Sequence, residues 1–184
     1  MSILNFQKPD KILLQKATDF HGQFEFKPLE PGFGQTIGNS LRRILLSSLE
    51  GYAISAIRIA GVDHEFSSIP GVVEDVVDII LNIKQIRLKS AVKGDKATEH
   101  QIYITISGQD EFRAKDIESR TNMFKVMNPE LLICKMEPSV NLELEMTITK
   151  GRGYVPAEEN MPENAPIGVI PVDAIYTPLK KVSY

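Results

Sequence analysis

The residues with the clearest chemical potential are two adjacent arginines and a nearby leucine, Arg42, Arg43 and Leu46, within residues 31–51, PGFGQTIGNSLRRILLSSLEG. A planar guanidinium can donate paired hydrogen bonds to a carboxylate or carbonyl group, and a desolvated leucine beside it supplies an apolar anchor. An arginine pair alone could be a solvated helix edge. The neighbouring leucine favours a mixed protein–protein interface instead.

A helix over residues 36–49 would position these side chains. With Thr36 as the N-cap and about 100° of rotation per residue, apolar residues gather in one stripe. The stripe contains Ile37, Leu41, Ile44, Leu45 and Leu49. Leu46 falls outside it, Arg43 lies nearly opposite and Arg42 lies at its flank. The helix should end at Glu50, with Gly51 in a left-handed C-cap conformation. A second face on one helix indicates assembly with another protein.

Three glycines at the start of this helix, Gly32, Gly34 and Gly38, allow a different hypothesis, a nucleotide-binding protein whose glycine turn approaches a phosphate. A dinucleotide site would need a buried strand before the glycines and an acidic residue about 20 positions further on. The preceding strand alternates instead, and the downstream position holds Arg58. Tight packing and capping are therefore the favoured roles of these glycines.

No other pattern predicts catalysis or a bound cofactor. The three histidines are scattered, and only His64 has close acidic neighbours, which should alternate faces in an extended segment. No nucleophile stands beside a base in a familiar arrangement, so we expect no catalytic, metal or cofactor site. Cys134 is the only cysteine, and its setting in LLICKM predicts a small hydrophobic residue of the core.

Composition bounds the class of protein. A chain of 184 residues with 42% hydrophobic residues can build one core or two lobes. A net charge of -3 and a pI near 5.7 provide no broad basic face, so direct DNA contact is not expected. No apolar run approaches the roughly 20 residues needed to cross a bilayer. We therefore expect a cytoplasmic protein without membrane contact.

Periodicity predicts an α+β fold. Strand alternation precedes the first helix at residues 23–29 and follows it at residues 52–60. An amphipathic helix is predicted over residues 72–84. The middle of the chain is mostly strand-like, with runs at residues 86–88, 102–106, 131–136 and 142–148. Residues 107–121 form a charged connection that could hold one short strand at 111–114. Residues 151–166 lack regular pattern, and a last strand is predicted within 167–176.

Three motifs, in order, carry a resemblance to a family. The motifs are GFGQTIGNSLRRILLSSLEG, GVDHEFSSIPGVVEDVVDIILNIKQI and GRGYVPA, and they are followed by IGVIPVDAIYTPLKKVSY. Together they resemble the amino-terminal domain of the bacterial RNA polymerase alpha subunit. The resemblance implies a two-lobed scaffold that dimerises and then recruits the beta and beta-prime subunits. The chain would not be an enzyme by itself but a subunit of a nucleotidyltransferase. The resemblance further implies two lobes. One is a dimerisation lobe of residues 1–50 and 172–184, and the other is an inserted, mostly β lobe of residues 51–171 with one amphipathic helix.

The resemblance also assigns residues to interfaces. It places Phe33, Ile37, Leu41 and Ile44 against the core and the second alpha copy. Contacts with the large subunits are assigned to Arg42, Arg43, Leu46, Asp78 and Lys84. The family continues beyond the position of Tyr184, so the resemblance implies a partial dimerisation lobe and a weakened second-copy contact. A generic homo-oligomeric structural protein is the remaining alternative; it would have no affinity for the large subunits.

Overall fold

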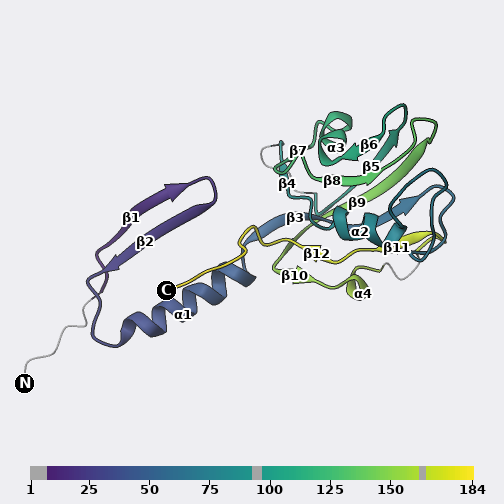
Figure 1. Ribbon diagram of the computed structural model, residues 1–184. Coiled ribbons are helices and arrows are strands. Elements are labelled where there is room, and N and C mark those ends of the chain that lie inside the picture. The colour runs from purple at the N-terminus through teal and green to yellow at the C-terminus, as the bar shows by residue number, and fades with distance from the viewer. Residues whose placement is uncertain (1–7, 93–96, 162–164) are drawn as a thin grey trace, which may run out of the picture. The chain divides into compact units, whose positions relative to one another are not determined.

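The computed structural model describes residues 8–92, 97–161 and 165–184, and the chain divides into two compact units. Unit 1 comprises Met1–Leu45 and Lys181–Tyr184, and unit 2 comprises Leu46–Lys180. Figure 1 shows a hairpin and a long helix in unit 1 and a curled antiparallel sheet with short helices in unit 2. The α+β fold class predicted from the sequence is confirmed.

Unit 1 contains an isolated two-stranded sheet. Strand β1 (Lys11–Thr18) pairs antiparallel with β2 (His21–Lys27), and Ile12 lies opposite Phe26 while Leu14 lies opposite Phe24. Because directly opposite residues share a face, this register gathers four large apolar side chains on one side of the hairpin. Ile12, Leu14 and Phe24 are each more than half exposed. The hairpin therefore presents an apolar face to solvent.

Helix α1 (Phe33–Ser47) begins and ends earlier than the sequence predicts. Thr36 is not its N-cap, because Gly32 takes a positive φ of 88° and the amide of Phe33 already donates to the carbonyl of Glu30 at 3.1 Å. Gly51 is not its C-cap either. That glycine lies within strand β3 (Glu50–Ile59), where it pairs with Gly151. Strand pairing, a long-range interaction, decided where this helix ends.

A six-stranded antiparallel sheet forms the body of unit 2. Its order is β5 (Glu99–Ile106), β9 (Leu142–Arg152), β3, β4 (Leu88–Ser90) and β7 (Phe124–Val126). Strand β11 (Val169–Pro171) pairs with the far end of β3, opposite Ala56 to Arg58. The strands predicted at residues 102–106 and 142–148 are confirmed, and the one predicted at 131–136 forms β8 (Leu132–Lys135) in a separate sheet with β6 (Glu111–Arg113). The strand predicted at 86–88 lies two residues later, as β4, and β7 is an additional strand that periodicity did not reveal.

Alternation along the strands builds the core. Every second residue of β5 is buried, and Ile102, Ile104 and Ile106 lie directly opposite buried residues of β9. Each fully buried aliphatic side chain contributes about 1.5–3 kcal/mol relative to an exposed one. Cys134, on β8 (Leu132–Lys135), is completely buried, as predicted, and burial followed by the charge of Glu74 raises the pKa of its thiol to about 12.

Helix α2 (Val76–Ile83) is shorter than predicted at its amino-terminal end. Val72 forms a β-bridge with Met136, and Val73 donates its amide to the carbonyl of Lys135 at 2.9 Å. The carboxylate of Glu74 accepts the amide of Lys135 at 2.6 Å. These bonds to Lys135 and Met136 hold residues 72–74 out of the helix. Within α2, Val76, Ile79 and Ile83 are buried, as the helical spacing predicts.

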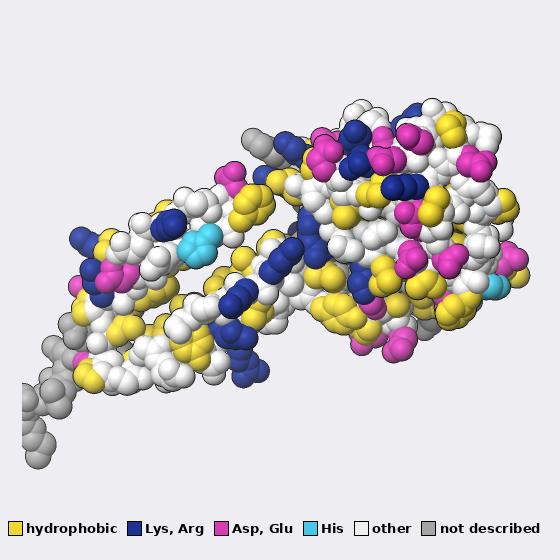
Figure 2. Space-filling view, viewed as in Figure 1, with side chains coloured by type: hydrophobic (Ala, Val, Ile, Leu, Met, Phe, Trp, Pro, Cys, Tyr) yellow, Lys and Arg dark blue, Asp and Glu magenta, His cyan; other side chains and the backbone are white. Residues whose placement is uncertain are grey.

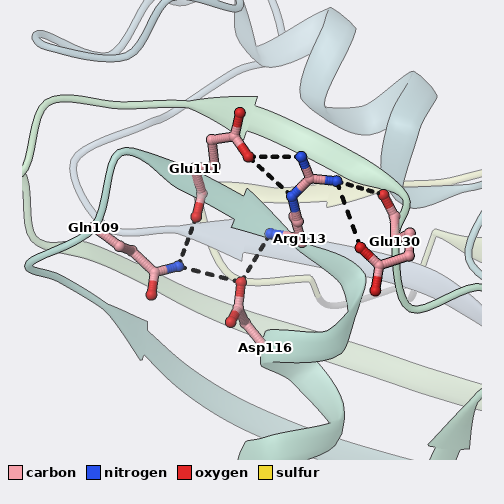
Figure 3. Close-up of polar contacts among 5 residues, drawn as sticks. All are labelled: Gln109, Glu111, Arg113, Asp116 and Glu130. Carbon is pink, nitrogen blue, oxygen red and sulfur yellow. Dashed lines mark hydrogen bonds and ion pairs between the residues drawn. The ribbon is translucent and has the colours of Figure 1, made fainter.

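Helix α3 (Ala114–Arg120) was not predicted; the sequence indicated only the preceding strand, β6 (Glu111–Arg113), which is confirmed. Figure 3 shows what positions the helix start. The carboxylate of Asp116 accepts the amide of Arg113 at 2.8 Å, and Gln109 donates to the same carboxylate at 3.2 Å. The guanidinium of Arg113 bonds Glu111 at 2.7 Å and the carbonyl of Glu130 at 2.8 Å. This network, absent from any local pattern, fixes the strand-to-helix turn.

The carboxy-terminal part of unit 2 is more regular than predicted. The expected loop contains the end of β9, strand β10 (Tyr154–Val155) and helix α4 (Ala157–Asn160), while its residues 162–164 lie outside the described residues. Strand β12 (Ala174–Ile175) pairs with β10. Residues 172–180, which the resemblance groups with the first lobe, belong to unit 2 here, since Val172, Ala174 and Tyr176 are buried in it. The functional boundary between the two lobes stays a prediction.

Candidate subunit interface

Helix α1 buries none of its residues within the chain. Phe33 is 41% exposed and Ile44 54% exposed, and Ile37 and Leu41 are half-buried. The apolar stripe predicted from the sequence is therefore present, but in this chain it is not covered by a core. Figure 2 shows apolar side chains together with lysine and arginine side chains along this helix. Such a surface is typical of an interface that has lost or not yet met its partner.

Arg43 and Leu46, which border the predicted second face of α1, and Arg42, at the flank of the apolar stripe, lie in different environments. Arg43 is exposed and Leu46 is half-buried, so neither is enclosed in a core. Arg42 is exposed but donates from Nη1 to the carbonyl of Val182 at 2.7 Å. In this structure the guanidinium of Arg42 thus secures the last residues of the chain along the helix.

Tyr184 completes that attachment. A Cβ atom on Gly38 would lie 2.3 Å from the Tyr184 ring, so only glycine admits the ring this close to α1. Gln35 is 3.5 Å from the Tyr184 hydroxyl. The predicted packing role of Gly38 is therefore confirmed, and its partner is a tyrosine from the far end of the sequence.

The second group of predicted contact residues lies at α2. Lys84, just after the helix, forms an ion pair with Asp173 at 3.1 Å, and both side chains are about 70% buried, with exposures of 27% and 29%. The other carboxylate oxygen of Asp173 accepts the amide of Ala157 at 2.9 Å, at the start of α4. The Ala157 amide, followed by Lys84, lowers the pKa of Asp173. One carboxylate therefore ties together α2, α4 and β12.

Tyr154 of the GRGYVPA motif joins the same cluster. Partial desolvation, followed by its hydrogen bond with Asp173, raises the pKa of the Tyr154 phenol. The side chain is 57% exposed, so its ring remains accessible beside the ion pair. The structure thus brings together Lys84, which the resemblance assigns to a large-subunit contact, the GRGYVPA loop and the segment that begins at Asp173.

An apolar groove of about 330 Å³ lies between α2, α4 and β11. Its lining consists of Val77, Ile80, Leu81, Ala157, Ile170 and Pro171, with Glu65 and Glu158. Leu81 is 45% exposed and Val77 36%, while Asp78 is exposed in the first turn of α2. A concave apolar surface with charges at its edge matches the usual anatomy of a protein interface.

Sequence reasoning missed two parts of this site. It did not pair Lys84 with Asp173, because 89 residues separate them and no local pattern links them. It also missed Arg87, whose Nη1 lies 3.4 Å from the carbonyl of Ile175 and whose pKa is lowered by desolvation. The only sequence feature that could have pointed to Arg87 as part of this site is that a basic residue stands next to a predicted buried strand.

Other kinds of site find no support in the described part of the chain. No three His, Cys, Asp or Glu residues there lie close enough to hold a metal ion. The described helices include none that is both long enough and apolar enough to cross a membrane. Within these residues the exposed apolar stripe of α1 and the groove beside α2 are the candidate surfaces for a partner.

Comparison with known proteins identifies the family. The family model described as the RNA polymerase Rpb3/RpoA insert domain matches residues 57–177, which lie within unit 2. Over all 184 residues the chain is 56% identical to the DNA-directed RNA polymerase subunit alpha of Flavobacterium psychrophilum and 57% identical to that of Cytophaga hutchinsonii. It is 55% identical to that of Bacteroides fragilis. In each case the match covers 100% of this chain and 55% of the relative.

The chain belongs to the RNA polymerase Rpb3/RpoA insert-domain family. The resemblance to the alpha subunit drawn from its motifs is thereby confirmed. The chain spans little more than half the length of the curated relatives that it matches.

Proposed function

We propose that this chain is an assembly scaffold of a bacterial RNA polymerase that pairs with a second alpha copy and recruits the beta and beta-prime subunits, without performing catalysis itself. The observation that carries the proposal is α1, a 15-residue helix none of whose residues is buried, with an apolar stripe that stays partly exposed. Membership of an RNA polymerase subunit family supports other polymerase subunits as the partners. In this role the chain would work in the cytoplasm, where it would assemble with the other subunits.

The contact with a second copy would use the apolar stripe of α1. Phe33, Ile37, Leu41 and Ile44 follow one side of the helix and are all at least partly exposed. The apolar face of the β1–β2 hairpin adds exposed area of the same kind. Burying such side chains contributes about 25 cal/mol per Å² of apolar surface, so a second copy is a favourable cover for them.

The contacts with the large subunits would use Arg43 and Leu46 on α1 and Asp78 and Lys84 at α2. Arg43 offers directional hydrogen bonds and Leu46 an apolar anchor. At α2, the groove beside Leu81 could accept an apolar side chain of a large subunit. Lys84 would act mainly by fixing Asp173 and the GRGYVPA loop, because its ammonium is already 3.1 Å from that carboxylate.

Co-purification with separately purified beta and beta-prime subunits tests the proposal. Arg43→Ala and Leu46→Asp should each weaken capture by about tenfold or more, the loss expected for an interface anchor, and should leave the melting temperature unchanged. Arg120→Ala is the matched control, since Arg120 is an exposed arginine at the end of α3. Normal capture by both α1 variants would contradict the proposal, and so would an absence of capture by the unmodified chain.

A further inference from the structure

The exposed face of the β4–β7 ribbon carries cations and methionines but no acidic residue. Lys89 lies directly opposite Lys125, and the pairing continues past the strand ends, where Met127 donates its amide to Arg87 at 2.8 Å and Ala91 donates to Met123 at 2.9 Å. Because alternate residues share a face, the outward positions form one set, which we call the basic ribbon. Its members are Arg87, Lys89, Ala91, Met123, Lys125 and Met127.

Burial confirms which side of the ribbon is outward. Leu88, Phe124 and Val126, three of the residues that alternate with those of the basic ribbon, are 2–8% exposed and belong to the core. Lys89 and Lys125 are exposed, and Met127 is 55% exposed. The two ammonium groups therefore extend from directly opposite positions into solvent.

Like charges directly opposite each other on neighbouring strands are destabilising. The other cations of the six-stranded sheet avoid this cost: Arg58 pairs with Glu145 at 3.7 Å, and Lys150 and Arg152 pair with Glu50 at 2.8 and 2.7 Å. Among the described residues, no carboxylate lies within ion-pair distance of Lys89 or Lys125. As far as the described residues go, the basic ribbon is thus a local concentration of positive charge without an ion-pair partner, on a chain whose net charge is -3.

Arg87 connects the basic ribbon to the surface already described. Among the described residues its guanidinium meets a backbone carbonyl, that of Ile175 at 3.4 Å, and no carboxylate, and it is half-buried. Ile175 follows Asp173 by two positions on the segment that Lys84 holds. The ribbon is therefore continuous with the surface assigned to the large subunits.

We propose that the basic ribbon is a docking surface for an acidic polypeptide segment, containing apolar residues, of a large polymerase subunit. The three cations complement its carboxylates, and Met123 and Met127 provide adaptable apolar contact. Three cations interleaved with methionines suit such a segment better than nucleic acid, which needs a longer row of cations along its phosphates. The inference rests on the proposed scaffold function and names the chemistry of its partner.

The test is binding of purified beta and beta-prime subunits to the 184-residue chain and its variants. A double variant, Lys89→Glu with Lys125→Glu, should weaken capture of one large subunit by about tenfold, and raising the ionic strength from about 0.05 to about 0.3 M should weaken capture by the unmodified chain. Lys115→Glu, an exposed lysine on α3 outside the ribbon, is the matched control and should bind normally.

The single variant Lys89→Glu separates binding from folding. It places a glutamate opposite Lys125, so its melting temperature should equal or exceed that of the unmodified chain while its capture of the large subunit weakens. A parallel loss of melting temperature and capture would overturn the inference, since the ribbon would then be merely structural.

The remaining outcomes are equally decisive. If the unmodified chain captures the large subunits and the double variant does so equally well, the scaffold function stands and the docking surface is wrong. If the unmodified chain captures neither subunit, the scaffold function itself is wrong. Binding of a labelled single-stranded DNA oligonucleotide that the double variant loses would overturn the polypeptide assignment in favour of nucleic acid.

Discussion

Replacing Gly51 with alanine should destabilise unit 2 and loosen the segment that carries Asp173. A Cβ atom at this position would lie 2.0 Å from the backbone oxygen of Tyr176 and 3.0 Å from its carbonyl carbon. Rotating a side chain cannot relieve a clash with backbone. The Tyr176 backbone must therefore withdraw by about 1 Å to reach even a 3.0 Å contact.

The displaced segment is held by several hydrogen bonds. The amides of Tyr176 and Thr177 both donate to the carbonyl of Gly153, at 2.9 and 3.1 Å, and the Tyr176 hydroxyl bonds Thr149 at 2.7 Å. Overpacking typically costs about 1–3 kcal/mol, and each weakened hydrogen bond adds about 0.5–1.5 kcal/mol. We expect a loss of about 3 kcal/mol in the free energy of unfolding. For a chain of this size that lowers the melting temperature by roughly 6–12 °C.

Thermal denaturation, monitored by circular dichroism, measures the change in melting temperature. Hydrogen exchange at the amides of Tyr176 and Thr177 measures whether the segment that carries Asp173 has loosened. Gly34→Ala is the matched control, because nothing lies within 4 Å of its Cβ position and the residue is within α1. The same chemical change there should be neutral or stabilising by up to about 1 kcal/mol. A Gly51→Ala variant that melts with the unmodified chain and keeps both amides protected would refute the steric argument.

Three further predictions concern the ion pairs and the core. Asp173→Asn should lower the free energy of unfolding by about 1 kcal/mol at neutral pH, a value discounted because the ion pair is partly exposed to solvent. Because the pKa of Asp173 is lowered in the folded chain, the stability difference between the two chains should vanish as the pH falls below the ordinary pKa of 3.8 and through the folded pKa. Urea titrations at several pH values measure this difference. Glu50 has its pKa lowered to about 2 by Arg152 and then Lys150, so its contribution should be lost as pH falls from about 4.5 to about 2, and Glu50→Gln should remove that part of the acid transition. Ile79→Ala, at a fully buried position of α2, should cost about 2–5 kcal/mol in urea unfolding, while Leu81→Ala on the exposed side should cost less than about 1 kcal/mol; equal losses would show that the assigned faces of α2 are wrong.

The sequence by itself determined the features that depend on local periodicity and residue chemistry. Alternation along β5 and β9 set which side chains enter the core, because successive side chains of a strand point to opposite faces. The apolar surroundings of Cys134 were enough to predict its burial. The spacing of Arg43 and Leu46 relative to the apolar stripe of α1 predicts a second helix face from the sequence alone.

Tertiary structure decided what depends on contacts between distant segments. Helix α2 begins at Val76 because residues 72–74 are bonded to Lys135 and Met136, and Gly51 belongs to β3 because β9 pairs with it. Lys84 meets Asp173, and Lys89 faces Lys125, only because the fold brings these segments together. A local sequence pattern predicts which face of its helix or strand a side chain occupies. The partner that it meets depends on strand register and chain crossing, which only the folded chain fixes.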